Sequence, residues 1–147
     1  MARFSETIEV ATDPATSFAY VADFTTAAEW DPGILEARAL DEGSPRVGGR
    51  YEVLAAFRGR SIPFRYEILE LVANERIVIR GEGGKAVSDD TIVFEPAGAG
   101  TRITYEADLR LKGAWRLAEP FLGRTFAAMG RKALAGLKRE LDRRSGP

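Results

Sequence analysis

The sequence predicts an α+β domain in which a curved antiparallel sheet of seven strands wraps around one long C-terminal helix. Two observations predict it. Between residues 34 and 111, turn-forming residues separate six short segments with the composition of strands. Residues 114–145 then change to the period of an amphipathic helix. At 147 residues the chain has the usual size of one domain, so we expect a single domain over 1–147.

The N-terminal part predicts one strand followed by two short helices. Residues 3–11 alternate as a half-buried strand does. Asp13 and Pro14 then supply a capping residue and a proline at the first helical position, which predicts a helix over 14–22. A second helix is expected over 25–30, and it should end there because Pro32 disfavours helical geometry at Asp31. Lying between the first two strands, these helices are expected to plug one end of the sheet.

The middle of the chain predicts an antiparallel meander covered on one side. The last strand is the clearest, since Ile103, Tyr105 and Ala107 fall on one face and Thr104 and Glu106 on the other. Seven such strands must curl to wrap a single helix. The expected strands after the two helices are 34–40, 49–57, 61–72, 76–82, 87–95 and 101–111.

The long helix has an inward stripe that ends in large residues. Leu134, Leu137 and Leu141 share one line of the helix and are expected to pack tightly on the sheet. Leu117 and Phe121 fall on the opposite side if the helix is continuous. Either the helix bends near Pro120, or this segment meets a partner or acts as a lid.

The middle of the same stripe is made of small residues. Gly123, Ala127 and Gly130 either leave space or allow close packing against a large strand residue such as Tyr66 or Tyr105. We favour space, because a strongly curved sheet cannot follow the helix along its whole length. An apolar cavity of roughly 300–1,000 Å³ is therefore expected here.

Strand parity predicts which side chains line this cavity. The inward positions are rich in aromatic residues, and Asp90 shares their parity unless a bulge puts Asp89 in its place. Glu119 and Glu6 are two further acids that could face inward, and no catalytic residue is assigned. The expected ligand-binding residues are Trp30, Tyr51, Phe64, Tyr66, Ile79, Asp90, Tyr105, Gly123, Phe126, Ala127 and Gly130.

Composition excludes several kinds of chemistry. The chain has no Cys and no His, so it offers no disulfide, thiolate nucleophile, imidazole base or common transition-metal site. We expect no metal and no cofactor. Residues 110–147 hold ten Lys/Arg and three Asp/Glu, which predicts a basic helix lying against an acidic body rather than a nucleic-acid site. Without an apolar span or a secretory leader, the expected location is the cytoplasm.

Three stretches resemble a known family. They are Ile8-Glu-Val-Ala-Thr-Asp-Pro14, Ala22-Asp-Phe with Trp30-Asp-Pro-Gly33, and Gly100-Thr-Arg-Ile-Thr-Tyr-Glu106. In this order they resemble the START-like helix-grip superfamily, and more closely its polyketide cyclase/dehydrase and lipid-transport branch (SRPBCC). The resemblance covers essentially the whole chain and implies a hydrophobic cavity between sheet and helix. The iron–sulfur members need Cys and His ligands, which this chain lacks.

The resemblance leaves three functions open. The first is binding of a hydrophobic small molecule such as a lipid or polyketide. The second is a polyketide cyclase, aromatase or dehydrase that uses Tyr, Arg and Asp groups in the cavity. The third is a protein-interaction module in which the basic helix and the Phe121 region contact a partner. We expect a hydrophobic small-molecule partner, no nucleic acid, no integral membrane association, and a monomer or homodimer.

Overall fold

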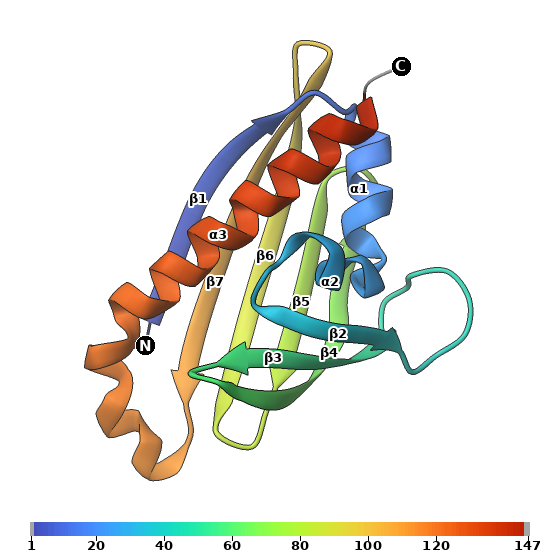
Figure 1. Ribbon diagram of the computed structural model, residues 1–147. Helices are drawn as coiled ribbons and strands as arrows, with labels where there is room; N and C mark the ends of the chain where they lie inside the picture. Colours follow the sequence, from blue (N-terminus) through green and yellow to red (C-terminus); the bar gives the residue numbers. More distant parts are fainter. Residues whose placement is uncertain (1, 146–147) are drawn as a thin grey trace.

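The computed structural model describes residues 2–145 and has the predicted α+β architecture. A seven-stranded antiparallel sheet curves around one side of the long helix α3, and three short helical segments lie between the first two strands (Figure 1). The elements are β1 (Ala2–Val10), α1 (Pro14–Ala22), η1 (Phe24–Thr26), α2 (Ala27–Trp30), β2 (Ile34–Ala39), β3 (Arg50–Phe57), β4 (Arg60–Val72), β5 (Arg76–Glu82), β6 (Ala86–Ala97), β7 (Gly100–Leu111), η2 (Gly113–Ala118) and α3 (Glu119–Ser145).

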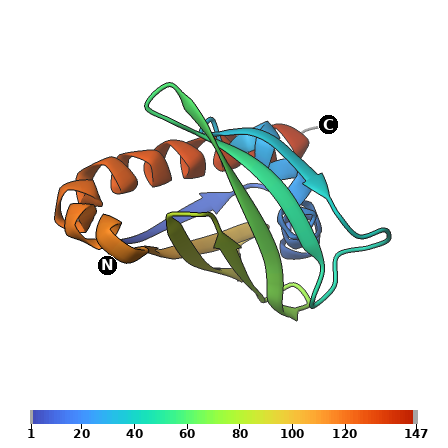
Figure 2. The same cartoon turned by 90° about the horizontal axis from the view of Figure 1, so that it is seen from below.

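The strands are ordered β1-β7-β6-β5-β4-β3-β2. Adjacent strands are therefore consecutive in the sequence, except for the pair β1 and β7. Seen from below, the β2–β4 part of the sheet bends away from β1 and β7 (Figure 2). β4 has a register shift between Ile68 and Glu70, and Leu69 at this shift is exposed. Such bulges increase the local twist, which is what a sheet wrapping one helix requires.

Local sequence signals explain where the helices begin. The Asp13 side chain accepts a hydrogen bond from the Thr16 amide at 3.1 Å, and Pro14 is the first residue of α1. The helix expected over 25–30 is a 3₁₀ turn followed by the single α-turn of α2. The helix expected over 114–145 is likewise divided, because Pro120 fits only the first turn of an α-helix and α3 begins at Glu119.

The large residues of the inward stripe form the centre of the core, as predicted. Leu134, Leu137 and Leu141 are at most 1% exposed. They belong to one cluster of buried residues that also includes Trp30 of α2 and Ile103 of β7. The helix is thereby fixed against both the plug and the sheet near its C-terminal end.

Gly136 lets α2 approach α3 closely, since a Cβ built there would overlap the carbonyl oxygen of Trp30. We expect Gly136→Ala to lower the free energy of unfolding by about 1–3 kcal/mol. The added methyl group would meet the backbone of α2, which cannot move aside as a flexible side chain can. The matched control is Gly123→Ala in the same helix, where a Cβ meets nothing within 4 Å. That change should stabilise by about 0.5–1 kcal/mol through helix propensity. Urea unfolding measures both, and equal effects would contradict the close approach.

Candidate functional site

A group of polar side chains lies on the concave, helix-facing side of the sheet. Asp90 of β6 is 5% exposed, so the predicted inward orientation is confirmed. Its Oδ1 accepts a hydrogen bond from the Ser88 hydroxyl at 2.7 Å, and its Oδ2 accepts one from the Tyr105 hydroxyl of β7 at 2.5 Å. Ser88 and Asp90 share a face because they are two positions apart on one strand. Strand geometry therefore assembles this hydrogen-bonded trio.

Asp31 brings a second carboxyl group to this region from the turn between α2 and β2. Its Oδ1 accepts a hydrogen bond from the Gly33 amide at 2.8 Å, which fixes the turn. Burial raises the pKa of Asp31 to about 6, and the negative charge of Asp90 acts in the same direction. Asp31 was expected only as a turn residue, because an Asp-Pro-Gly sequence is by itself typical of a turn.

Burial dominates the protonation of the other groups as well. It raises the pKa of Asp90 to about 6, although the hydrogen bonds from Ser88 and Tyr105 oppose the shift. It also raises the pKa of the Tyr66 and Tyr105 hydroxyls, and the charge of Asp90 adds to both shifts. At neutral pH both tyrosines are therefore hydrogen-bond donors beside two carboxyl groups that have lost most of their solvation.

Three polar atoms of this region have no hydrogen-bond partner among residues 2–145. They are Oδ2 of Asp31, the hydroxyl of Tyr66 and Nε1 of Trp30. The first is an acceptor when Asp31 is ionised, the second can donate and accept, and the third only donates. Of the three, Trp30 Nε1 alone is fully buried, so it alone carries the cost of an unpaired buried polar group. The Asp31 and Tyr66 oxygen atoms keep some solvent contact and are open to a guest that can hydrogen-bond to them.

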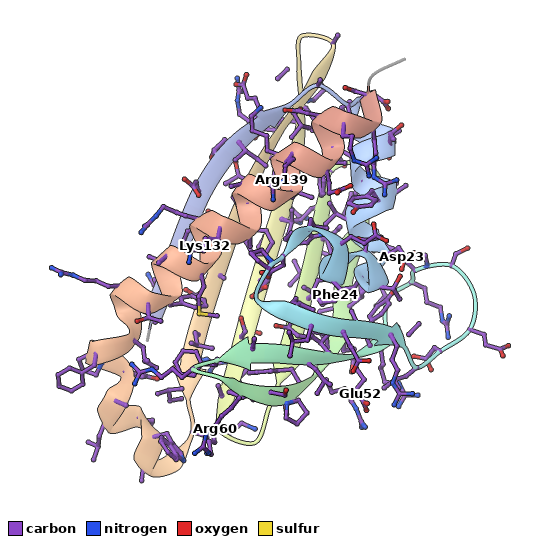
Figure 3. The ribbon with its side chains drawn as sticks, in the orientation of Figure 1. Asp23, Phe24, Glu52, Arg60, Lys132 and Arg139 are labelled. Carbon is purple, nitrogen blue, oxygen red and sulfur yellow. The ribbon has the colours of Figure 1, made fainter. Side chains whose placement is uncertain are left out.

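The other expected ligand-binding residues fall into two groups. Trp30, Tyr51 and Ile79 are at most 5% exposed and belong to the packed core. Phe64, Phe126 and Ala127 are half-buried. Phe24, labelled in Figure 3, packs on both Tyr51 and Tyr66, with ring centroids 5.9 and 4.8 Å apart. Two tyrosines of the expected set therefore pack against an aromatic ring from η1.

The expectation of a cavity beside Gly123 and Gly130 is wrong at Gly130. A Cβ on Gly130 would lie 2.7 Å from the ring of Phe4, so this glycine serves close packing of α3 on β1. Gly123 borders open space but is exposed to solvent. Gly130 is small because the aromatic ring of Phe4 from β1 occupies the space that was expected to hold a ligand.

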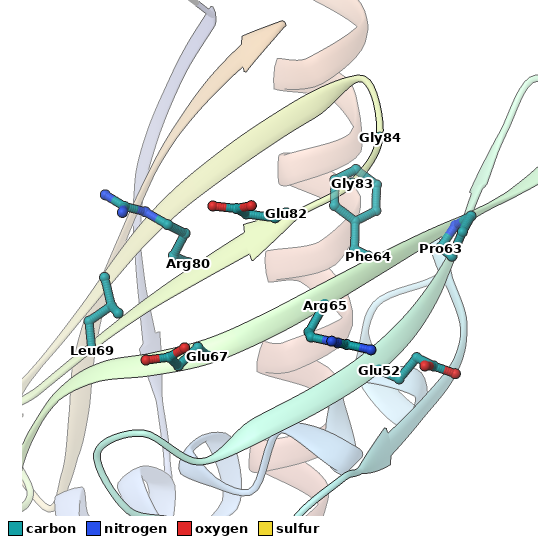
Figure 4. A pocket seen from close by; sticks show the side chains of 10 residues that line it. All are labelled: Glu52, Pro63, Phe64, Arg65, Glu67, Leu69, Arg80, Glu82, Gly83 and Gly84. Atoms are coloured by element: carbon teal, nitrogen blue, oxygen red, sulfur yellow. The ribbon is translucent and has the colours of Figure 1, made fainter. Parts of the chain in front are cut away.

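The outer surface has two hollows, and neither is lined by Gly123, Ala127 or Gly130. The larger, of about 640 Å³, crosses β3, β4 and β5 on the face turned away from α3, which passes behind the strands in Figure 4. Its walls carry charged side chains of both signs, such as Glu67 and Arg80. The smaller, of about 380 Å³, lies between the ends of β6 and β7 and η2. A charged surface groove does not suit an apolar ligand.

Within residues 2–145 no three acidic side chains are grouped so as to hold a metal ion. In the same part of the chain, no helix combines the length and the apolar character needed to cross a bilayer.

Comparison with known proteins identifies the class. Residues 1–142 match the family model described as "Polyketide cyclase / dehydrase and lipid transport". The chain therefore belongs to this family, whose members share the START-like helix-grip fold. The sequence resemblance to this family is thus confirmed. A search of curated proteins found no match.

Solved structures with the same fold cover nearly the whole chain. A protein of Thermus thermophilus is 17% identical with a TM-score of 0.83, over 98% of this chain and 99% of that one. A START superfamily protein of Mycobacterium smegmatis is 21% identical with a TM-score of 0.75, over 96% and 99%. The aromatase/cyclase Zhui of a Streptomyces species is 15% identical with a TM-score of 0.80, over 98% and 95%. At these identities the likeness establishes the fold.

Proposed function

We propose that this protein binds a mainly apolar small molecule between α3 and the concave face of the sheet. The observation that carries the proposal is the set of polar groups, Asp31, Tyr66, Asp90 and Tyr105, placed inside an otherwise apolar wall. Small-molecule sites typically combine apolar walls with a few convergent polar groups that orient the ligand.

The accessibility of the two tyrosines supports a hollow beside them. Burial raises the pKa of both hydroxyls, yet Tyr66 and Tyr105 each keep part of their surface accessible. This combination of many neighbours and partial accessibility suits a side chain at the wall of a ligand site. Ala127 and Phe126 of α3 are half-buried against the same core and would form the opposite wall.

The ligand that suits these groups is apolar over most of its surface and carries one polar end. That end would meet Asp31 and Tyr66, whose free oxygen atoms can accept and donate a hydrogen bond. No lysine or arginine acts on the pKa of Asp31 or Asp90. A ligand with a hydroxyl, carbonyl or amine group is therefore favoured over one with a carboxylate.

A fluorescent apolar probe tests the proposal. We expect N-phenyl-1-naphthylamine to bind the wild-type protein, and Ala127→Trp to weaken binding about tenfold or more by filling the space. Ala135→Trp places the same side chain on the exposed face of α3 and should leave the affinity unchanged. Fluorescence titration gives the affinities and circular dichroism verifies folding, with Ala127→Met as a smaller insertion. Equal affinities in folded variants, or no binding to the wild type, would contradict the proposal.

A polyketide cyclase or dehydrase activity is the second candidate. Asp31 and Asp90, with pKa values of about 6, could take up and return protons near neutral pH, and the tyrosine hydroxyls could polarise carbonyl groups. The family includes such enzymes by its description. If the protein is an enzyme, Asp90→Asn should abolish turnover of a poly-β-ketone while leaving probe affinity intact.

A further inference from the structure

Residues 113–124, the helical tip, comprise η2 and the first turn and a half of α3. Trp115 is 52% exposed, and Leu117 and Phe121 are each 82% exposed. The tip lies at the end of the molecule opposite the C-terminus and projects beyond the sheet (Figures 1 and 2). Isolated exposed apolar residues are ordinary, but three large ones within a stretch of seven are not. Within residues 2–145 the other large exposed apolar residues stand apart from one another elsewhere in the fold: Leu35, Val47 and Leu69.

Positive charge surrounds these apolar side chains. Residues 110–131 hold five Lys/Arg and one Asp/Glu, in a chain whose net charge is −1. Lys85, from the turn between β5 and β6, places Nζ 4.4 Å from the centroid of the Trp115 ring. Arg116 and Arg124 are exposed and form no ion pair with a described residue. The tip therefore combines apolar side chains with two arginines outside the ion pairs of the fold and with one acid, Glu119.

The smaller surface hollow adjoins the tip and is also basic. Arg110, Lys112 and Arg116 line it, together with one acid, Glu119. The Glu119 carboxylate accepts a hydrogen bond from the Leu111 amide at 2.7 Å, which ties α3 to the end of β7. Arg110 is paired with Asp89 at 2.8 Å and Lys112 with Glu82 at 3.9 Å, which leaves Arg116 as the lining cation outside these ion pairs. In a hollow of about 380 Å³, Arg116 can contact the anionic end of a lipid headgroup.

We propose that the helical tip docks on the surface of an anionic lipid bilayer. Trp115, Leu117 and Phe121 enter the region between headgroups and acyl chains, while Lys85, Arg116 and Arg124 contact phosphate groups. Interfacial binding uses this combination of buried apolar area and attraction of Lys/Arg to anionic lipid. Trp is favoured at this depth because its ring is apolar and its N–H is polar.

A bilayer fits this surface better than a folded protein does. The three apolar residues project from a narrow, protruding tip, whereas a stable protein interface usually buries about 800 Å² on each partner. A soft lipid interface can close around single side chains without a complementary shape. The proposal is independent of ligand binding in the interior, because none of its residues belongs to the interior site.

Sedimentation with vesicles is the primary test. With vesicles containing phosphatidylglycerol, the wild-type protein should sediment at low ionic strength, and binding should weaken as salt is raised. Vesicles of pure phosphatidylcholine should bind about tenfold more weakly. Trp30 is only 4% exposed, so any blue shift of tryptophan emission on binding reports on Trp115 and should disappear in Trp115→Phe.

Matched variants locate the contact. Phe121→Ser and Arg124→Glu should each reduce vesicle affinity about tenfold. Leu35→Ser, an exposed apolar residue on β2, and Arg139→Glu, on the exposed side of α3 (Figure 3), should leave the affinity unchanged. The proposal is overturned if the wild-type protein does not bind anionic vesicles, or if it binds both lipid compositions with equal affinity. It is also overturned if the tip variants and the control variants have the same vesicle affinity. Binding of an acidic protein without vesicle binding would also overturn it.

Discussion

Leu137→Ala is expected to lower the free energy of unfolding by about 2–5 kcal/mol, the usual cost of replacing a buried leucine by alanine. Leu137 is 0% exposed and lies between Leu134 and Leu141 in the core cluster. The substitution leaves a cavity that the sheet on one side and α2 on the other cannot easily fill, because both are fixed by other contacts.

Leu117→Ala is the matched control for this change, since Leu117 is 82% exposed. It should alter the free energy of unfolding by no more than about 0.5 kcal/mol. Urea unfolding followed by circular dichroism measures both variants. A loss below about 1 kcal/mol for Leu137→Ala would mean that α3 does not pack on the sheet in the described register.

The protein should become more stable as the pH falls from 7.5 to 5. Asp90 has a pKa of about 6 in the folded protein against an ordinary value of 3.8, so the folded state holds a proton that the unfolded state releases. The penalty of burying its charge is complete above about pH 7 and disappears as protons bind below pH 6. The shift of about 2 units corresponds to about 3 kcal/mol at most. Asp31, also with a raised pKa, acts in the same direction.

Asp90→Asn separates this effect from the titration of other acids. It should stabilise the protein at pH 7.5 and remove much of the gain between pH 7.5 and pH 5, as measured by urea unfolding at both values. Carboxyl groups with lowered pKa, such as Asp41 beside Arg50, act oppositely but titrate below this window. Glu70→Gln, at an exposed ion pair with Arg76, should keep the wild-type pH dependence. A wild-type protein that is less stable at pH 5 would contradict the assignment.

Local patterns were sufficient to predict the fold. The Asp13-Pro14 cap, the alternation over 101–111 and the leucines of α3 each depend on neighbours within a few residues, and each was confirmed. The exposed position of Phe121 also followed from helical phase. The predicted helices differ from the structure at two places, near Pro120 and at Phe24–Thr26, where a 3₁₀ turn precedes the α-helix.

Contacts between distant segments were not predictable in the same way. Gly130 was expected to border a cavity, but its neighbour is Phe4, and nothing in the sequence around either residue fixes their registry. Asp31 was missed because its role in the turn accounts for it locally, while its proximity to Asp90 arises only when the plug closes on the sheet. The inward position of Asp90 could be predicted because strand parity alone determines it.

A crystal structure of the protein with an apolar ligand that carries one hydroxyl or amine group tests the central claim most directly. The ligand should lie between α3 and the concave face of the sheet, with its polar end within hydrogen-bond distance of Asp31 or Tyr66 and its apolar part near Phe126 and Ala127. A ligand found only in the outer groove over β3, β4 and β5, or an interior closed by side chains at saturating ligand, would contradict it.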